Sequence, residues 1–263
     1  MKPTETRKQK IVAIFIAYNC ARTLRKFYEN FPRHLVDDII LVDDASFDHS
    51  YELAKSLGIH AYKNPINLGY GGNLKRILAL GIKRGGDVFI DIHPDGEYKT
   101  NAIPLALEKI KNGSKFILGN RFTYINQPLK SGMYFWKFIP IFLMNTVDSL
   151  ILGTKIGDLH QGFRVYTKEL LEKVSFENNS NNYLFSFELI AQASFWNIKI
   201  DEVPVETNYT GKKRGATLKN SIRYSLGTFK ILFLYLLTRA GIKNKIFLKP
   251  KKNILERVEK LSK

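Results

Sequence analysis

The sequence has 263 residues and a net charge of +17, from 41 Lys and Arg against 24 Asp and Glu. This length is sufficient for one large domain with its own hydrophobic core, and the composition is that of an ordinary globular protein. The single cysteine, Cys20, excludes an internal disulfide, and no CxxC pair indicates a zinc site, so the sequence favours a reducing compartment.

The positive charge is concentrated at the C-terminal end. Residues 209–263 contain 15 basic and two acidic side chains, which accounts for +13 of the net charge, whereas the first 208 residues are nearly balanced. A local positive field of this size indicates an anionic partner, which is a lipid surface, a nucleic acid or a phosphorylated substrate.

The N-terminus and two apolar segments bear on membrane association. The first ten residues are polar and lack the apolar core of a signal peptide, and charged residues interrupt the apolar segments 133–153 and 222–242. Neither segment has the roughly 18 consecutive apolar residues of a spanning helix. For 133–153, a core helix and an interfacial helix both remain open, whereas 222–263 favours the membrane surface. We therefore expect a cytoplasmic protein that is peripheral on the inner face of the cytoplasmic membrane.

In chain order, short apolar segments alternate with segments of helical periodicity. This alternation predicts an α/β fold with a largely parallel sheet covered by helices on both faces. The predicted strands are residues 11–17, 37–46, 58–64, 87–98 and 115–122. The predicted helices lie near 22–30 and 49–57, within 67–85, where Leu74, Ile77, Leu78 and Ile82 have helical spacing, and near 103–110.

Possible metal ligands follow the fourth predicted strand in the segment VFIDIHPDGEY. His93, Asp95 and Glu97 are spaced two apart, so on a continuous strand they would point to the same side. In parallel sheets, ligands bind at the carboxyl ends of the strands. The pattern therefore predicts a site for Mg²⁺ or Mn²⁺ at this edge.

Local structure alone offers a second interpretation of the same motifs. HPDGEY is a good β-turn sequence, because Pro94 and Gly96 supply turn geometry. In VDDAS, Asp44 or Ser46 would serve only to cap the next helix. NLGYGGN does not match GxGxxG or a phosphate-binding loop.

Six motifs occur in order: IFIAYN, ILVDDASFD, NLGYGGN, HPDGEY, LGNRF and DLHQGFRVY. Together they resemble the family 2 glycosyltransferases with a GT-A fold, on the side that includes the dolichyl-phosphate mannose and glucose synthases. The resemblance covers about residues 10–218. It implies a GT-A domain over residues 1–218, followed by a basic, apolar-faced helical tail over 219–263, and a nucleotide-diphosphate sugar as donor.

The resemblance implies a donor site at the ends of the first two strands. The end of the first strand would line the base pocket, the acidic pair of the second would contact the nucleoside, and the glycines of NLGYGGN would let the next helix approach the donor. The implied donor-binding residues are Ala17, Tyr18, Asn19, Asp43, Asp44, Asp95, Gly71 and Gly72.

HPDGEY takes the place of the family's metal motif, DADGQ. Asp95 matches the second aspartate of that motif and Glu97 matches the glutamine, whereas His93 stands where the first aspartate is usual. Asp91, two residues before His93 on the strand, is expected inside the fold. Asp95 is thus the principal metal ligand that the resemblance implies.

The remaining motifs imply acceptor and catalytic residues. Arg121 in GNR would meet the acceptor phosphate, and Lys137 would be a second cation there. DLHQGFRVY would place Asp158 and Arg164 on the acceptor side. The segment YTGKKRGATL resembles a flexible catalytic segment of the family, in which Lys212, or Arg214 in its stead, would stabilise the leaving diphosphate.

The resemblance implies an inverting transfer that depends on a divalent metal ion. An ionised polyprenyl phosphate would attack without a strong base, whereas a sugar hydroxyl would need one, for which Asp158 is the candidate. We expect transfer to a polyprenyl (dolichyl or undecaprenyl) phosphate at an anionic membrane surface. The alternatives are transfer to a sugar hydroxyl in glycolipid or polysaccharide assembly, a non-catalytic protein with this fold, and a nucleic-acid-binding protein, which the absence of an RNA-binding motif disfavours.

Overall fold

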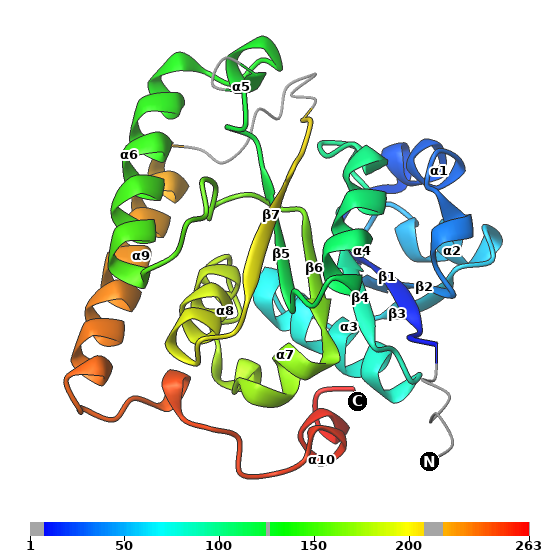
Figure 1. The fold of residues 1–263 in the computed structure, drawn as a ribbon. Helices are drawn as coiled ribbons and strands as arrows, with labels where there is room; N and C mark the ends of the chain where they lie inside the picture. Colours follow the sequence, from blue (N-terminus) through cyan, green and yellow to red (C-terminus); the bar gives the residue numbers. More distant parts are fainter. Residues whose placement is uncertain (1–7, 125–126, 208–217, 263) are drawn as a thin grey trace.

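A seven-stranded sheet of order β3-β2-β1-β4-β6-β5-β7 forms the centre of the computed structural model, which describes residues 8–124, 127–207 and 218–262 (Figure 1). Strand β6 runs antiparallel to both of its neighbours, and the other pairings are parallel. The predicted, largely parallel α/β sheet is therefore confirmed. The strands are β1 (Ile11–Ala17), β2 (Asp38–Asp43), β3 (His60–Lys63), β4 (Val88–Asp91), β5 (Phe116–Asn120), β6 (Arg164–Thr167) and β7 (Ile200–Pro204).

Strand β1 shows why the central strands are apolar throughout. Val12 and Ile14 point into one hydrophobic cluster, and Ala13 and Phe15 point into a second cluster on the opposite face. A strand that is buried on both faces has no position for a polar side chain, which explains the continuous run IVAIFIA.

Helices cover both faces of the sheet. Helices α1, α2 and α4 pack on one face, and α3, α7, α8, α9 and α10 contribute to the cluster on the other. The helices are α1 (Ala21–Glu29), α2 (Ser50–Ser56), α3 (Tyr70–Lys83), α4 (Ile103–Lys111), α5 (Gln127–Lys130), α6 (Phe135–Leu152), α7 (Lys168–Lys173), α8 (Leu184–Phe195), α9 (Leu218–Arg239) and α10 (Ile254–Glu259). Single 3₁₀ turns lie at Arg33–Leu35, Thr100–Ala102, Phe176–Asn178 and Lys245–Phe247.

The fourth strand is shorter than predicted. It ends at Asp91, where it pairs with Ile14 of β1 and Arg164 of β6, and residues 94–97 form a turn. Pro94 has no N–H to continue the ladder, which favours an early end. The predicted extension of this strand to residue 98 is therefore wrong.

The segment that follows residue 218 packs on the main core. Ile231 and Leu232 of α9, Phe247, and Val258 of α10 belong to the same buried cluster as residues of α3 and α8. The buried Arg257 guanidinium pairs with Glu177, with Nη2 2.6 Å from Oε2. This part of the chain therefore shares the core of the α/β domain.

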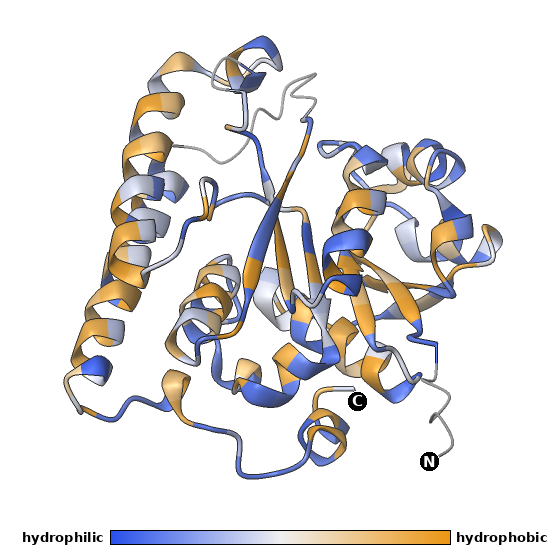
Figure 2. Cartoon of the chain, in the orientation of Figure 1, coloured by the Kyte–Doolittle hydropathy of each residue, from blue (hydrophilic) through white to orange (hydrophobic). Residues whose placement is uncertain are grey.

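Helices α6 and α9 lie side by side along one edge of the molecule, and both carry apolar outer surfaces (Figures 1 and 2). Within the described ranges, no helix has the length and apolar character needed to cross a membrane. The exposed apolar side chains of this pair include Phe135, Trp136, Ile139, Phe142, Leu143, Val147, Leu150, Ile222, Leu226, Phe229, Phe233 and Leu236, and we call this the α6–α9 face.

Candidate active site

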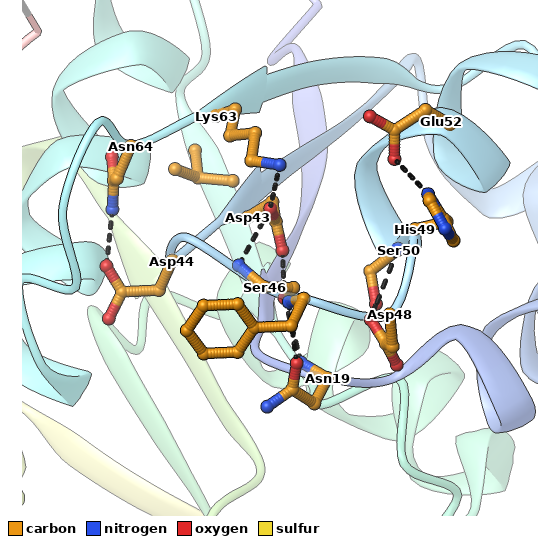
Figure 3. Close-up of polar contacts among 12 residues, drawn as sticks. Asn19, Asp43, Asp44, Ser46, Asp48, His49, Ser50, Glu52, Lys63 and Asn64 are labelled. Atoms are coloured by element: carbon orange, nitrogen blue, oxygen red, sulfur yellow. Dashed lines mark hydrogen bonds and ion pairs between the residues drawn. The ribbon is translucent and has the colours of Figure 1, made fainter.

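The loops after β1 and β2 hold each other in place. Asn19 has a left-handed backbone with φ of 51°, and its N–H donates to Ser46 Oγ at 2.8 Å. Its side-chain Oδ1 accepts from the N–H of Phe47 at 3.0 Å (Figure 3). The predicted residues Ala17, Tyr18 and Asn19 thus border the loop that follows Asp43, as the motif order implies.

Asp43 contacts two residues, Ser46 and Lys63, that line a pocket between the loop after β2 and the end of β3. Its carboxylate is fully buried, accepts hydrogen bonds from the Oγ and N–H of Ser46, and lies 4.0 Å from the Nζ of Lys63. Burial raises the pKa of Asp43 above its usual value, and the hydrogen bonds from Ser46 and the charge of Lys63 partly offset this. The adjacent pocket of about 540 Å³ is lined by Ala45, Ser46, Phe47, Lys63, Asn64 and Pro65.

Asp44 has a different environment from its neighbour. Its Oδ1 accepts from Asn64 Nδ2 at 2.6 Å and from the N–H of Leu68 at 2.8 Å, and its Oδ2 accepts from the N–H of Gly69 at 3.0 Å. Both oxygens therefore hold the loop that leads into α3. A direct contact of Asp44 with a nucleoside stays a prediction.

The glycines of NLGYGGN pack against another part of the protein. The N–H groups of Gly71 and Gly72 both donate to the carbonyl oxygen of Asn181, at 2.8 and 3.2 Å. A Cβ on Gly71 would lie 2.3 Å from the carbonyl oxygen of Ser180, so only glycine fits. The close approach that these glycines allow is to residues 180–182, and the predicted donor contact remains untested.

The HPDGEY segment is a turn, so the argument from strand alternation is wrong. The Oδ1 of Asp95 accepts from the N–H of Glu97 at 2.9 Å, and Gly96 has a positive φ of 76°. Among the described residues, no group of three His, Cys, Asp or Glu side chains is arranged to hold a metal ion. His93, Asp95 and Glu97 are therefore neighbours in one turn without forming such a group.

Two of these side chains nevertheless fit a divalent cation. Partial burial, and then the negative charge of Asp95, raise the pKa of the Glu97 carboxyl, while Arg121 and His93 act in the opposite direction. A carboxyl group whose ionisation is disfavoured by burial and by a neighbouring carboxylate is stabilised in its charged form by a hard cation beside it. The Nε2 of His93 is buried without a hydrogen-bond partner in the described structure, which leaves a third donor atom beside this turn.

Arg121 and Asp158, which the resemblance assigns to the acceptor side, form a buried ion pair. The Nε of Arg121 lies 2.6 Å from Oδ2 of Asp158, and Nη2 lies 3.0 Å from Oδ1, so the two side chains meet at two points. Tyr98, the last residue of HPDGEY, connects that segment to the loop that contains Asp158, because its hydroxyl accepts from the N–H of Gly162 at 2.8 Å. Two motifs that are distant in sequence are thereby joined.

Arg164 lies at the start of β6 in a buried polar layer. Its Nη1 donates to the hydroxyl of Tyr70 at 3.3 Å, and the ring of Tyr70 lies 5.7 Å from the ring of His93. Asp91 lies inside the fold, as expected, where its Oδ2 accepts from the hydroxyl of Tyr166 at 2.8 Å and burial raises its pKa. Arg164 is thus linked through Tyr70 to His93, and its contact with an acceptor stays a prediction.

Three predicted cations remain without a described environment. Lys212 and Arg214 lie outside the described residues. Lys137 lies on α6, and only its place on that helix is described.

Sequence reasoning missed three residues that the structure places at the site, namely Lys63, Tyr70 and Tyr98. Lys63 ends β3 at the same edge of the sheet as Asp43, so the rule that ligands bind at strand ends would have identified it. Tyr70 and Tyr98 lie within motifs that were noted, but their partners, Arg164 and Gly162, come from a later segment.

Comparisons with known proteins identify the family of the chain. The family model described as "Glycosyl transferase family 2" matches residues 12–175. A UDP-N-acetylglucosamine–dolichyl-phosphate N-acetylglucosaminyltransferase from Methanococcus voltae is 26% identical over 88% of this chain and 96% of its own length. A polyprenol monophosphomannose synthase from Mycolicibacterium smegmatis is 25% identical over 73% of this chain and 74% of its own length.

Among solved structures, the fold resembles glucosyl-3-phosphoglycerate synthase from Mycobacterium tuberculosis in complex with Mn²⁺, UDP and phosphoglyceric acid. The TM-score is 0.64 with 16% identity, over 90% of this chain and 80% of the other. At this identity the likeness concerns the fold.

Proposed function

Because the chain belongs to glycosyltransferase family 2, with relatives named as polyprenyl-phosphate sugar transferases, we propose that it transfers a sugar from a nucleoside-diphosphate donor to a polyprenyl phosphate. The transfer is proposed to be inverting, dependent on a divalent metal ion and located at a membrane surface.

We place the donor nucleoside in the pocket lined by Ser46, Phe47 and Lys63. Lys63 lines this pocket and lies 4.0 Å from the buried Asp43 carboxylate, and Phe47 offers an exposed ring for stacking. A relative that uses UDP-N-acetylglucosamine and a fold neighbour that holds UDP support a nucleotide at this edge.

We place the donor diphosphate over the turn of residues 94–97, which contains Asp95 and Glu97. Asp95 and Glu97 would hold Mg²⁺ or Mn²⁺, with His93 beside them, and the ion would neutralise the leaving diphosphate. Lys212 or Arg214 would add positive charge as the leaving group forms. The fold neighbours that contain Mn²⁺ or Mg²⁺ with UDP support this assignment.

The choice of acceptor depends on the Arg121–Asp158 pair. Both oxygens of Asp158 accept hydrogen bonds from Arg121, and the carboxylate is fully buried. A carboxylate held in this way is a poor general base, whereas an attacking phosphate oxygen is already ionised and needs positioning only. This observation carries the proposal of a phosphate acceptor, held by Arg121 with Lys137 and Arg164, over a sugar hydroxyl.

The α6–α9 face supports a location at the membrane surface. Leu150 and Leu226 are 81% and 66% exposed there, and a group of exposed apolar side chains favours an interaction site. Arg223 and Lys230 are exposed on α9 itself, so positive charge that attracts anionic lipid lies on the same helix as these apolar side chains.

The test is transfer from a panel of nucleotide sugars to undecaprenyl phosphate, with Mn²⁺, Mg²⁺ or EDTA. The wild type is compared with Asp95→Ala and with Glu108→Ala, which removes an exposed acid on α4. We expect transfer that requires the metal, is abolished in Asp95→Ala and is retained in Glu108→Ala. Transfer to a sugar hydroxyl in place of the lipid phosphate would overturn the acceptor, and no turnover with any donor would overturn the activity.

A further inference from the structure

A buried acid and a buried imidazole meet outside the residues used above. The Nε2 of His160 lies 2.8 Å from Oδ2 of Asp148, and the two side chains are 6% and 0% exposed. The ring of His160 stacks on Phe187 at 5.5 Å between centroids, and its Nδ1 lies 3.2 Å from the hydroxyl of Tyr224. An unpaired buried carboxylate is unfavourable, so the contact fixes the positions of both partners.

This cluster joins three separate parts of the fold. Asp148 lies on α6, His160 lies in the loop before β6, and Tyr224 lies on α9. Asn145, three residues before Asp148 on the same face of α6, accepts from the N–H of Leu159 at 2.9 Å. Helix α6 thus holds two consecutive residues of the loop through two buried polar side chains.

The same loop carries one half of the acceptor-side ion pair. The N–H of His160 donates to Oδ1 of Asp158 at 3.3 Å, and the carbonyl oxygen of His160 accepts from Nη2 of Arg121 at 3.3 Å. A displacement of the His160 backbone would therefore move both members of the pair.

The opposite sides of the two helices form the α6–α9 face. Val147 and Leu150, next to Asp148 in sequence, are 42% and 81% exposed, and Leu226, two residues after Tyr224, is 66% exposed. Each helix therefore holds the acceptor-side loop on its inner side and presents apolar side chains on its outer side.

We propose that His160 is a positioning residue that couples the seating of α6 and α9 on a lipid surface to the placement of Arg121 and Asp158. The inference rests on the proposed membrane surface and acceptor. It predicts that lipid contact orders the loop of residues 158–163 and that this ordering requires the Asp148–His160–Tyr224 cluster.

Hydrogen exchange of the full chain, with and without phosphatidylglycerol vesicles, tests the coupling without any need for turnover. In the wild type, we expect vesicles to slow exchange in α6 and α9, and to slow exchange at 158–163 by at least about fivefold. Asp148→Asn and Tyr224→Phe should retain the slowing in the helices and lose it in the loop. Tyr51→Phe on α2 is the matched control and should behave as the wild type does.

Transfer kinetics with vesicles that contain undecaprenyl phosphate supply a second measurement. The same two variants should lower kcat for the lipid acceptor by about tenfold, while their KM for the donor stays near that of the wild type. His160→Gln, which places a neutral side-chain amide beside Asp148, should lower kcat less than these two variants do. If a single variant fails to fold, the double variant Asp148→Leu/His160→Phe is measured in its place, because it removes both polar partners together.

The outcomes separate this inference from the proposed function. Equal slowing of loop exchange in the wild type and the variants, or helices that respond to vesicles while the wild-type loop does not, would overturn the coupling. A wild type that shows the coupling but never transfers to a lipid phosphate would leave the coupling standing and overturn the acceptor. Helices that do not respond to vesicles at all would overturn both the membrane surface and the coupling.

Discussion

The guanidinium of Arg121 meets the carboxylate of Asp158 at two points inside the protein, with Nε–Oδ2 at 2.6 Å and Nη2–Oδ1 at 3.0 Å. The resemblance of the sequence assigns them separate roles: Arg121 would contact an acceptor phosphate, and Asp158 would be a candidate base. Their pairing makes them one unit, in which each charge depends on the other for its stability in a buried site.

Breaking this pair should lower stability strongly. Asp158→Asn leaves the buried Arg121 charge without its counter-ion, so we expect the free energy of unfolding in urea to fall by about 3–5 kcal/mol. Lys173→Ala, which removes an exposed pair with Glu169 on α7, should cost less than about 1 kcal/mol. Equal losses in the two variants would contradict the assignment of a buried pair.

The two adjacent aspartates after β2 should differ in their effects. Asp44→Ala removes the acceptor of three hydrogen bonds in the loop before α3, and we expect it to cost about 3 kcal/mol of unfolding free energy. Asp43→Ala should instead weaken binding of a nucleoside diphosphate, because Asp43 holds Ser46 and Lys63, which line the pocket. Calorimetric titration with UDP and GDP, combined with urea unfolding, measures both effects. A loss of affinity without loss of stability in Asp44→Ala would reverse the assignment.

Gly71→Ala should destabilise the start of α3. The new Cβ would lie 2.3 Å from the Ser180 carbonyl oxygen and 2.8 Å from the Cβ of Phe185, so backbone must move, at a cost of about 1–3 kcal/mol. Thermal unfolding measures the change. Lys55→Ala, on an exposed position of α2, serves as the control and should leave the transition within about 0.5 kcal/mol of the wild type.

The α6–α9 face should control binding to lipid. The double variant Leu150→Asp/Leu226→Asp removes two exposed leucines, and each contributes apolar area that a bilayer would bury, so partition onto phosphatidylglycerol vesicles should fall by at least about tenfold. Leu255→Asp changes a leucine of similar exposure on α10 and should have little effect. Co-sedimentation measures the partition, and an equal effect of all three substitutions would point to a non-specific cause.

Cys20 should be unreactive in the native protein and should make stability depend on alkaline pH. Burial is the main cause that raises the pKa of its thiol to about 11 from an ordinary value of 9.0. Above pH 9 the thiol ionises in the unfolded chain before it ionises in the folded one, so the stability that it contributes is lost as the pH rises from about 9 to 11.

At pH 10 this loss is about 1 kcal/mol of unfolding free energy relative to Cys20→Ala, measured by urea unfolding of both proteins. Labelling of native Cys20 by a thiol-specific disulfide reagent at pH 8 should be slow compared with labelling in urea. Rapid labelling of the native protein would show that the thiol is accessible.

The sequence by itself determined the fold class and the edge of the sheet at which the site lies. Strands such as IVAIFIA are encoded locally, because burial on both faces demands an apolar side chain at every position. Parallel strands place their carboxyl ends at one edge of the sheet, so the acids after β2 and β4 lie at the same edge. The ordered motifs then identified the family without knowledge of any contact.

Only the tertiary structure decided what each side chain does within that edge. Asp43 and Asp44 are adjacent, yet one contacts residues that line a pocket and the other holds the loop before α3, because their hydrogen-bond donors come from different segments. Local alternation failed at HPDGEY, where β4 ends at Asp91 and residues 94–97 turn. The Asp148–His160 contact forms only when α6 packs beside the acceptor-side loop, and long-range packing of this kind leaves no periodic signal in a single sequence.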